Sequence, residues 1–140
     1  MFRNILVPSD FTEKSLHAAK IALQLARLQK AAKVTLLHIV ETIEGAEDDE
    51  FADFYEKLRK RAVGNMQKLV KSLGGEASTV QTAIVFGKRV PGIIHFVNEH
   101  QVDLIVLGSH KIDLEKVPEG LGTISYKVGI FSPCPVLMVK

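Results

Sequence analysis

Short apolar runs alternate with longer segments of helical periodicity along the whole chain. Runs of strand length occupy residues 5–7, 34–40, 80–86, 104–107 and 136–139. Between them, apolar residues recur every three or four positions over residues 12–30, 51–73, 90–97 and 124–131, which predicts four helices. The predicted order is therefore strand and helix in turn, ending on a fifth strand.

The apolar pattern within the strands indicates how the sheet is buried. Leu36 and Leu37 are adjacent in the second run, and residues 104–107 are apolar throughout, so both faces of these strands should be covered. The run 80–86 alternates more, with Gln81 inside it, which favours an edge position. Strands alternating with helices predict a single α/β domain over residues 1–140, a five-stranded parallel sheet with helices on both faces.

Composition and charge narrow the function classes. A length of 140 residues fits one domain, and a net charge of +2 offers no electrostatic footprint for nucleic acid. No apolar run approaches the roughly 20 residues that span a bilayer, so no membrane partner is expected. The lone Cys134 and the absence of a signal-peptide pattern at the start favour the reducing cytoplasm.

Candidate chemistry lies where parallel strands end, because ligands of open α/β sheets bind beyond the carboxyl ends of the strands. Three segments reach that edge: 8–12, 40–42 and 108–111, with 120–123 returning to it. Gly122 and Thr123 begin a predicted helix, where free N–H groups hold an anion or Thr123 simply caps the helix. Neither a P-loop nor a GxGxxG dinucleotide fingerprint is present.

Several polar residues have structural as well as functional interpretations. His38, between apolar strand residues, is expected to be a packed and hydrogen-bonded histidine, whereas His110 on the 108–111 segment is the better functional candidate. Ser109, His110 and Asp10 supply the residue types of a catalytic triad, but no GxSxG nucleophile elbow accompanies them. We therefore predict no catalytic residue and no metal ligand.

Four segments carry a resemblance to a known family. They read ILVPSD over 5–10, LLHIV over 36–40, DLIVLGS over 103–109 and SPCPVLMV over 132–139. In this order and spacing they resemble the universal stress protein family over essentially the whole chain. The resemblance implies a Rossmann-like sheet of strand order 3-2-1-4-5.

The resemblance also implies a nucleotide site. ATP-binding members carry a glycine, two residues, a second glycine, nine residues, then glycine and Ser or Thr. Here Gly108, Gly122 and Thr123 match and would face phosphate, Lys111 replaces the second glycine, and ten residues intervene instead of nine. Lys111 could offer its ammonium to phosphate in place of that glycine. By resemblance, Asp10 would meet ribose or base and Val40 would hold adenine. The full candidate set is Pro8, Asp10, Val40, Gly108, His110, Lys111, Gly122 and Thr123.

The function that the resemblance implies is a cytoplasmic stress-response protein that binds an adenine nucleotide, ATP, as a regulatory ligand. The alternative is a dimeric interaction protein that has lost nucleotide binding, with a protein partner that the sequence does not identify. An enzymatic role would be at most slow ATP hydrolysis, and a requirement for Mg²⁺ stays open. A homodimer is expected through the last strand, 136–139, because an apolar edge strand needs a cover.

Overall fold

Five parallel strands form one sheet in the order β3-β2-β1-β4-β5. The computed structural model describes residues 1–43, 51–111, 115 and 123–140. The strands are β1 Asn4–Pro8, β2 Lys33–Glu41, β3 Val80–Gly87, β4 Leu104–Gly108 and β5 Val136–Val139. The helices are α1 Glu13–Arg27, α2 Ala52–Ser72, the 3₁₀ helix η2 Gly74–Thr79, α3 Arg89–Glu99 and α4 Ile124–Phe131. The predicted fold class and strand order are confirmed.

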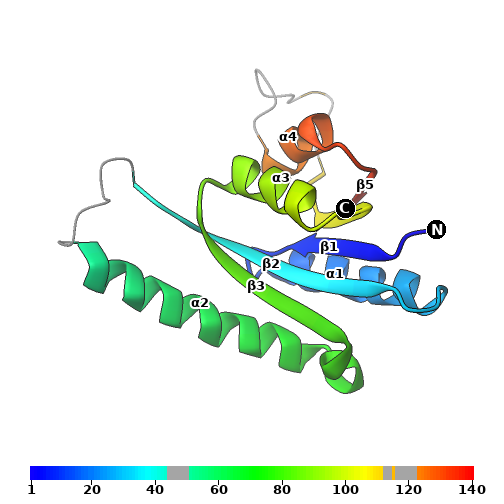
Figure 1. Ribbon diagram of the computed structural model, residues 1–140, viewed down its shortest axis with the longest axis horizontal. Coiled ribbons are helices and arrows are strands. Elements are labelled where there is room, and N and C mark those ends of the chain that lie inside the picture. Colours follow the sequence, from blue (N-terminus) through cyan, green and yellow to red (C-terminus); the bar gives the residue numbers. More distant parts are fainter. Residues whose placement is uncertain (44–50, 112–114, 116–122) are drawn as a thin grey trace.

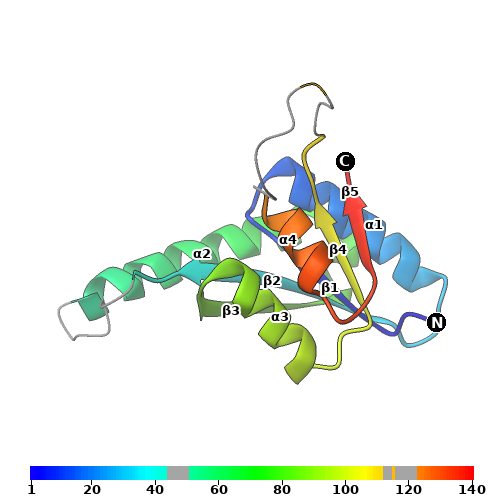
Figure 2. The ribbon, with the colours of Figure 1, turned by 90° about the horizontal axis from the view of Figure 1, so that it is seen from above.

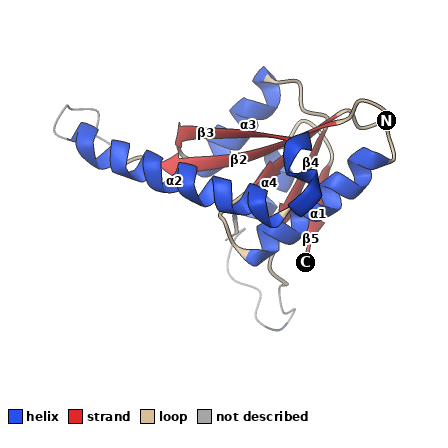
Figure 3. Cartoon of the chain, turned by 90° about the horizontal axis from the view of Figure 1, so that it is seen from below, coloured by secondary structure: helices blue, strands red, loops and turns tan. Residues whose placement is uncertain are grey.

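Helices cover both faces of the sheet, as the apolar pattern predicts. Helices α1 and α2 pack on one face and α3 and α4 on the other (Figure 1). From above, α3 and α4 lie in front of the strands (Figure 2), and from below α1 and α2 do (Figure 3). Neighbouring strand residues serve opposite faces: Ile5 and Val7 join the core under α1, and Leu6 joins the core under α3. This alternation follows from the period of two along a strand.

The place of each strand in the sheet matches the pattern of apolar residues along it. The alternating strand β3 lies at one edge, and the wholly apolar β4 lies between β1 and β5. From β1 the chain moves outward to β2 and β3, then returns to place β4 on the other side of β1. The order of strands therefore reverses between β1 and β4, and ligands of open α/β sheets bind at such a point.

Helix α2 extends beyond the part of the sheet that it covers (Figure 1). Its buried residues, Ala62, Met66 and Leu69, lie at its midpoint or beyond. Phe51, just before the helix, and Phe54 belong to the same apolar stripe but are exposed. The helix ends at Ser72, one residue before the end predicted from the apolar pattern, and Gly74 just beyond it takes a left-handed φ of 66°, which glycine adopts without strain. Within the described part of the chain, none of the helices is both long and apolar enough to cross a membrane.

Candidate functional site

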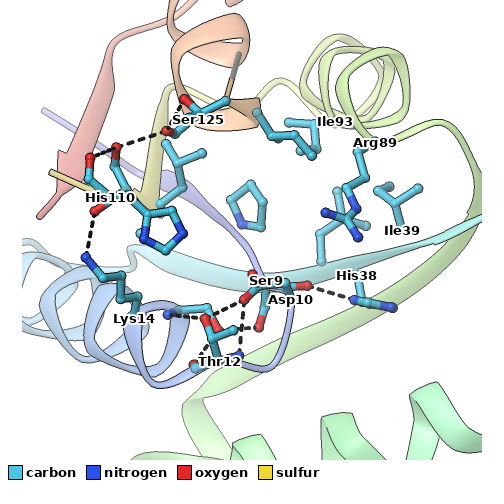
Figure 4. Close-up of a pocket in the computed structure, with 18 of the residues that line it drawn as sticks. Ser9, Asp10, Thr12, Lys14, His38, Ile39, Arg89, Ile93, His110 and Ser125 are labelled. Atoms are coloured by element: carbon cyan, nitrogen blue, oxygen red, sulfur yellow. Dashed lines mark hydrogen bonds between the residues drawn. The ribbon is translucent and has the colours of Figure 1, made fainter. Parts of the chain in front are cut away.

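A cavity of about 510 Å³ opens at the carboxyl ends of β1 and β4, where the strand order reverses. Figure 4 shows Lys14, His110 and Ser125 gathered at one end and Ile39, Ile93 and Arg89 at the other. The residues that line it are Pro8, Ser9, Asp10, Thr12, Glu13, Lys14, Ser15, Leu37, His38, Ile39, Arg89, Ile93, Leu107, Gly108, Ser109, His110, Thr123, Ile124 and Ser125. Among the described residues, the cavity thus has an end with apolar side chains and Arg89, and an end with hydroxyl groups and Lys14.

The turn from β1 into α1 forms the floor of the cavity. The Asp10 Oδ1 accepts hydrogen bonds from the Thr12 backbone N–H at 3.1 Å and from the Thr12 hydroxyl at 2.5 Å. The Thr12 side chain accepts from the Ser15 N–H and so caps α1. Between them, Phe11 has a φ of 66°, a strained conformation that costs about 1–3 kcal/mol for a residue with a Cβ. The turn is held in one conformation by these bonds.

Two carboxylates, Asp10 and Glu13, are among the described residues that line the cavity, and Asp10 is the one that Thr12 holds by hydrogen bonds. Partial burial raises its pKa, but the two hydrogen bonds from Thr12 and the nearby Arg89 guanidinium outweigh that effect and bring the pKa below its usual value. Arg89 begins α3, and its Nε lies 3.2 Å from the Glu41 carboxylate at the end of β2. Asp10 is therefore an ionised acceptor at neutral pH.

His38 lines the cavity, although the sequence analysis did not include it among the candidate site residues. The prediction of a packed, hydrogen-bonded histidine is confirmed, because its Nδ1 lies 2.7 Å from the Ser9 carbonyl oxygen. Its ring stacks on Phe11 with the centroids 4.2 Å apart. It also lines the cavity, which its position near the end of β2 could have signalled. His38 thus contacts both Ser9 and Phe11 and stabilises the strained turn between β1 and α1.

A line of hydroxyl groups crosses the opposite wall. The buried Ser109 and Ser125 hydroxyls are 2.9 Å apart, and the Thr123 hydroxyl is 3.3 Å from that of Ser125. Thr123 also accepts from the Tyr126 N–H and so caps α4. The Lys140 ammonium donates to Ser109 and to the Tyr126 hydroxyl, whose pKa is lowered by that hydrogen bond. Ser109 is engaged with Ser125 and Lys140, which is not the arrangement of a triad nucleophile.

Gly108 has a structural reason to be glycine. A Cβ built on it would lie 3.0 Å from the carbonyl carbon, carbonyl oxygen and Cβ of Lys14 in the first turn of α1. The end of β4 therefore packs directly against the backbone of α1. As a result the Lys14 Nζ reaches the Ser109 carbonyl oxygen, to which it donates at 3.1 Å.

Five of the eight residues predicted from the sequence line the cavity: Pro8, Asp10, Gly108, His110 and Thr123. Gly122 lies outside the described residues. Val40 is buried and is not among the described residues that line the cavity, to which β2 contributes Leu37, His38 and Ile39. Lys111 is exposed and is not among the described residues that line the cavity either.

Sequence reasoning missed Lys14 and Arg89, the lysine and the arginine among the described residues that line the cavity. Both lie in the first turns of helices, and only the packing of α1 and α3 on the sheet brings them to the cavity. Among the described residues, no group of three or more His, Cys, Asp or Glu side chains is placed to hold a metal ion.

Comparison with known proteins identifies the family. The model of the universal stress protein family matches residues 1–140. Universal stress protein MJ0577 of Methanocaldococcus jannaschii is 30% identical over 158 residues, which cover 100% of this chain and 96% of that protein. A solved structure of MJ0577 superimposes with a TM-score of 0.77 at 31% identity, covering 100% of this chain and 96% of that one.

Two further similar structures are complexes with adenine nucleotides. A universal stress protein in complex with cAMP has a TM-score of 0.71 at 20% identity and covers 99% of this chain and 97% of its own. An Arabidopsis thaliana universal stress protein family protein with AMP bound has a TM-score of 0.68 at 21% identity and covers 99% and 91%. At these identities the likeness is one of fold.

Proposed function

This chain belongs to the universal stress protein family, and we propose that it is a stress-response protein that binds an adenine nucleotide as a regulatory ligand. The observation that carries the proposal is the cavity of about 510 Å³ at the point where the strand order reverses. A volume between roughly 300 and 1,000 Å³ suits a ligand of nucleotide size. We place its action in the reducing cytoplasm, where the single thiol stays reduced.

The two ends of the cavity match the two ends of a nucleotide. Leu37, Ile39 and Ile93 offer apolar surface to a flat base. At the other end, the hydroxyls of Ser109, Thr123 and Ser125 and the first turn of α4 offer hydrogen bonds to phosphate. We therefore propose that the base binds toward Ile39 and the phosphate toward Ser125.

Asp10 lies between these ends, on the floor. One of its oxygens is used by Thr12, and a carboxylate has further lone pairs that accept from the hydroxyl groups of a ribose. Because its pKa is lowered, the carboxylate is ionised across the physiological range and acts as an acceptor only. We propose that it binds the ribose.

The ligands of the family members support the choice of base. The structures described with cAMP and with AMP share adenine and ribose and differ in their phosphate. We extend adenine and ribose recognition to this chain, and include ATP as a ligand because the phosphate end is open to solvent at the exposed His110.

The rival function is that of an interaction protein without a ligand. It is favoured by one observation: Lys111, which replaces the second glycine of the family's phosphate motif, is exposed and outside the cavity wall. A phosphate loop of altered shape would leave the cavity without nucleotide.

The experiment that tests the proposal uses the purified full chain. Denaturation followed by chromatography with ultraviolet detection looks for a co-purified adenine nucleotide. Calorimetric titration of the nucleotide-free protein with AMP, cAMP and ATP, with and without Mg²⁺, then measures affinity. Binding of an adenine nucleotide with a preference over the matching guanine nucleotide supports the proposal. Absence of binding at millimolar nucleotide rejects it in favour of the interaction protein.

A further inference from the structure

The polar end of the cavity contains a lysine that the family's phosphate motif does not include. Lys14 lies in the first turn of α1, is half-buried and lines the cavity (Figure 4). Its Nζ donates to the Ser109 carbonyl oxygen at 3.1 Å. An ammonium has three N–H donors, and the contacts among the described residues use one of them. Lys14 therefore has donors to spare for a ligand.

Backbone packing holds this lysine in place. The missing Cβ of Gly108 lets the first turn of α1 lie directly on the end of β4, where any Cβ would come within 3.0 Å of Lys14. The hydrogen bond to Ser109 then fixes the direction of the side chain. A cation that is ordered before the ligand arrives loses less conformational entropy on binding.

Among the described residues, no acidic side chain forms an ion pair with Lys14. Of the two carboxylates that line the cavity, Asp10 accepts hydrogen bonds from Thr12 and Glu13 is exposed. The other lining cation, Arg89, pairs with Glu41 at the far end of the cavity. The ammonium of Lys14 is therefore available to a negatively charged ligand at the hydroxyl end of the cavity.

Lys111 is not placed to supply this charge. It occupies the position of the family's second glycine, but it is exposed and lies outside the cavity wall. Lys14, by contrast, lines the same end as Ser109 and Ser125.

From these positions we propose that Lys14 binds the phosphate of the nucleotide and makes the site favour a doubly charged 5′-phosphate over a singly charged cyclic phosphate. This inference rests on the proposed function, because it assumes that the ligand is an adenine nucleotide. The second pKa of a phosphomonoester is about 6, so AMP carries nearly two negative charges near pH 7.5, whereas cAMP carries one. The attraction to an ammonium grows with the phosphate charge, and adenosine lacks this attraction because it has no phosphate.

The experiment compares Lys14→Met with Lys20→Met in the full-length chain. Lys20 is an exposed lysine of the same helix that does not line the cavity, so it controls for the loss of one positive charge. Calorimetry measures the affinities for AMP, cAMP and adenosine at low and moderate salt, and circular dichroism checks the fold of each variant.

We expect Lys14→Met to weaken AMP binding about tenfold or more, cAMP binding less, and adenosine binding by under about twofold. The loss for AMP should shrink as salt is added. Lys14→Arg should retain most of the affinity for AMP, and Lys20→Met should behave as the parent.

Three results would overturn the inference while leaving the proposed function intact. The first is an equal loss for adenosine and AMP in Lys14→Met, which would make Lys14 structural. The second is a loss of AMP affinity in Lys111→Met and none in Lys14→Met. The third is a parent protein that binds cAMP as tightly as AMP. A parent that binds none of the three ligands rejects the proposed function, and the role of Lys14 falls with it.

Discussion

Replacing Gly108 by alanine tests the packing that shapes the site. The new Cβ would lie 3.0 Å from three atoms of Lys14, two of them backbone. Carbon atoms prefer a separation of about 3.5–4.0 Å, so α1 and β4 must move apart by several tenths of an ångström. The contacting atoms are mostly main chain, and no rotamer change can relieve the overlap.

The magnitude follows from two opposing effects. Overpacking of this kind costs about 1–3 kcal/mol. Gly→Ala also reduces the entropy of the unfolded chain, which raises the free energy of unfolding by about 0.4–1 kcal/mol where the backbone suits alanine. The backbone at Gly108 is not left-handed, so that gain is available. The expected net loss in the free energy of unfolding is about 1–2 kcal/mol, or roughly 3–7 °C in the melting temperature of a chain this size.

The assay is equilibrium unfolding in urea, with Gly64→Ala as the matched control. Gly64 lies inside α2, and a Cβ there meets no atom within 4 Å. The same substitution should therefore stabilise the protein at Gly64, by about 0.5–1 kcal/mol, and destabilise it at Gly108. If Gly108→Ala is as stabilising as Gly64→Ala, α1 does not approach β4 as closely as described and the placement of Lys14 loses its basis.

Two further predictions concern pH and assembly. The pKa of Asp10 is lowered in the folded chain, so its ionised form stabilises the fold above the unfolded pKa, near 3.8, and this contribution disappears as the pH falls through the lower folded value. In urea unfolding, Asp10→Asn should thus have a lower free energy of unfolding than the parent at neutral pH, and this difference should disappear in acid. A difference that does not change with pH would contradict the hydrogen bonds from Thr12 to an ionised carboxylate. For assembly, the exposed Leu137 of edge strand β5 is expected to lie in the homodimer contact, so Leu137→Lys should lower the mass measured by light scattering, whereas Leu28→Lys, at another exposed leucine, should not. A monomeric parent at micromolar concentration would refute the dimer.

Much of the fold could be predicted from local pattern. A strand buried on both faces needs adjacent apolar residues, and Leu36 and Leu37 supply them, so the parallel sheet was predictable. Helix caps depend on neighbours three residues apart, and Thr12 caps α1 as its sequence context indicates. The strand order itself came from the family resemblance and is confirmed.

The site was predictable only in part, for a physical reason. Pro8, Asp10 and His110 line the cavity because they lie at the ends of β1 and β4 or two residues beyond them, and a strand end is visible in the sequence. Val40 came from the family resemblance, whereas β2 lines the cavity with Leu37, His38 and Ile39. Which of these residues reach the cavity depends on how the neighbouring strands and helices enclose it, and no local pattern records that.

The sequence by itself determined which segments become strands and helices, since those depend on residues within a few positions of one another. Tertiary structure alone decided that Lys14 meets Ser109 across 95 positions and that Arg89 meets Glu41. These contacts arise from how closely each helix packs on the sheet, which at Gly108 is set by a missing Cβ opposite a backbone far away in the chain. Such long-range distances leave no periodic trace in the sequence, and they decide where the charges of the site lie.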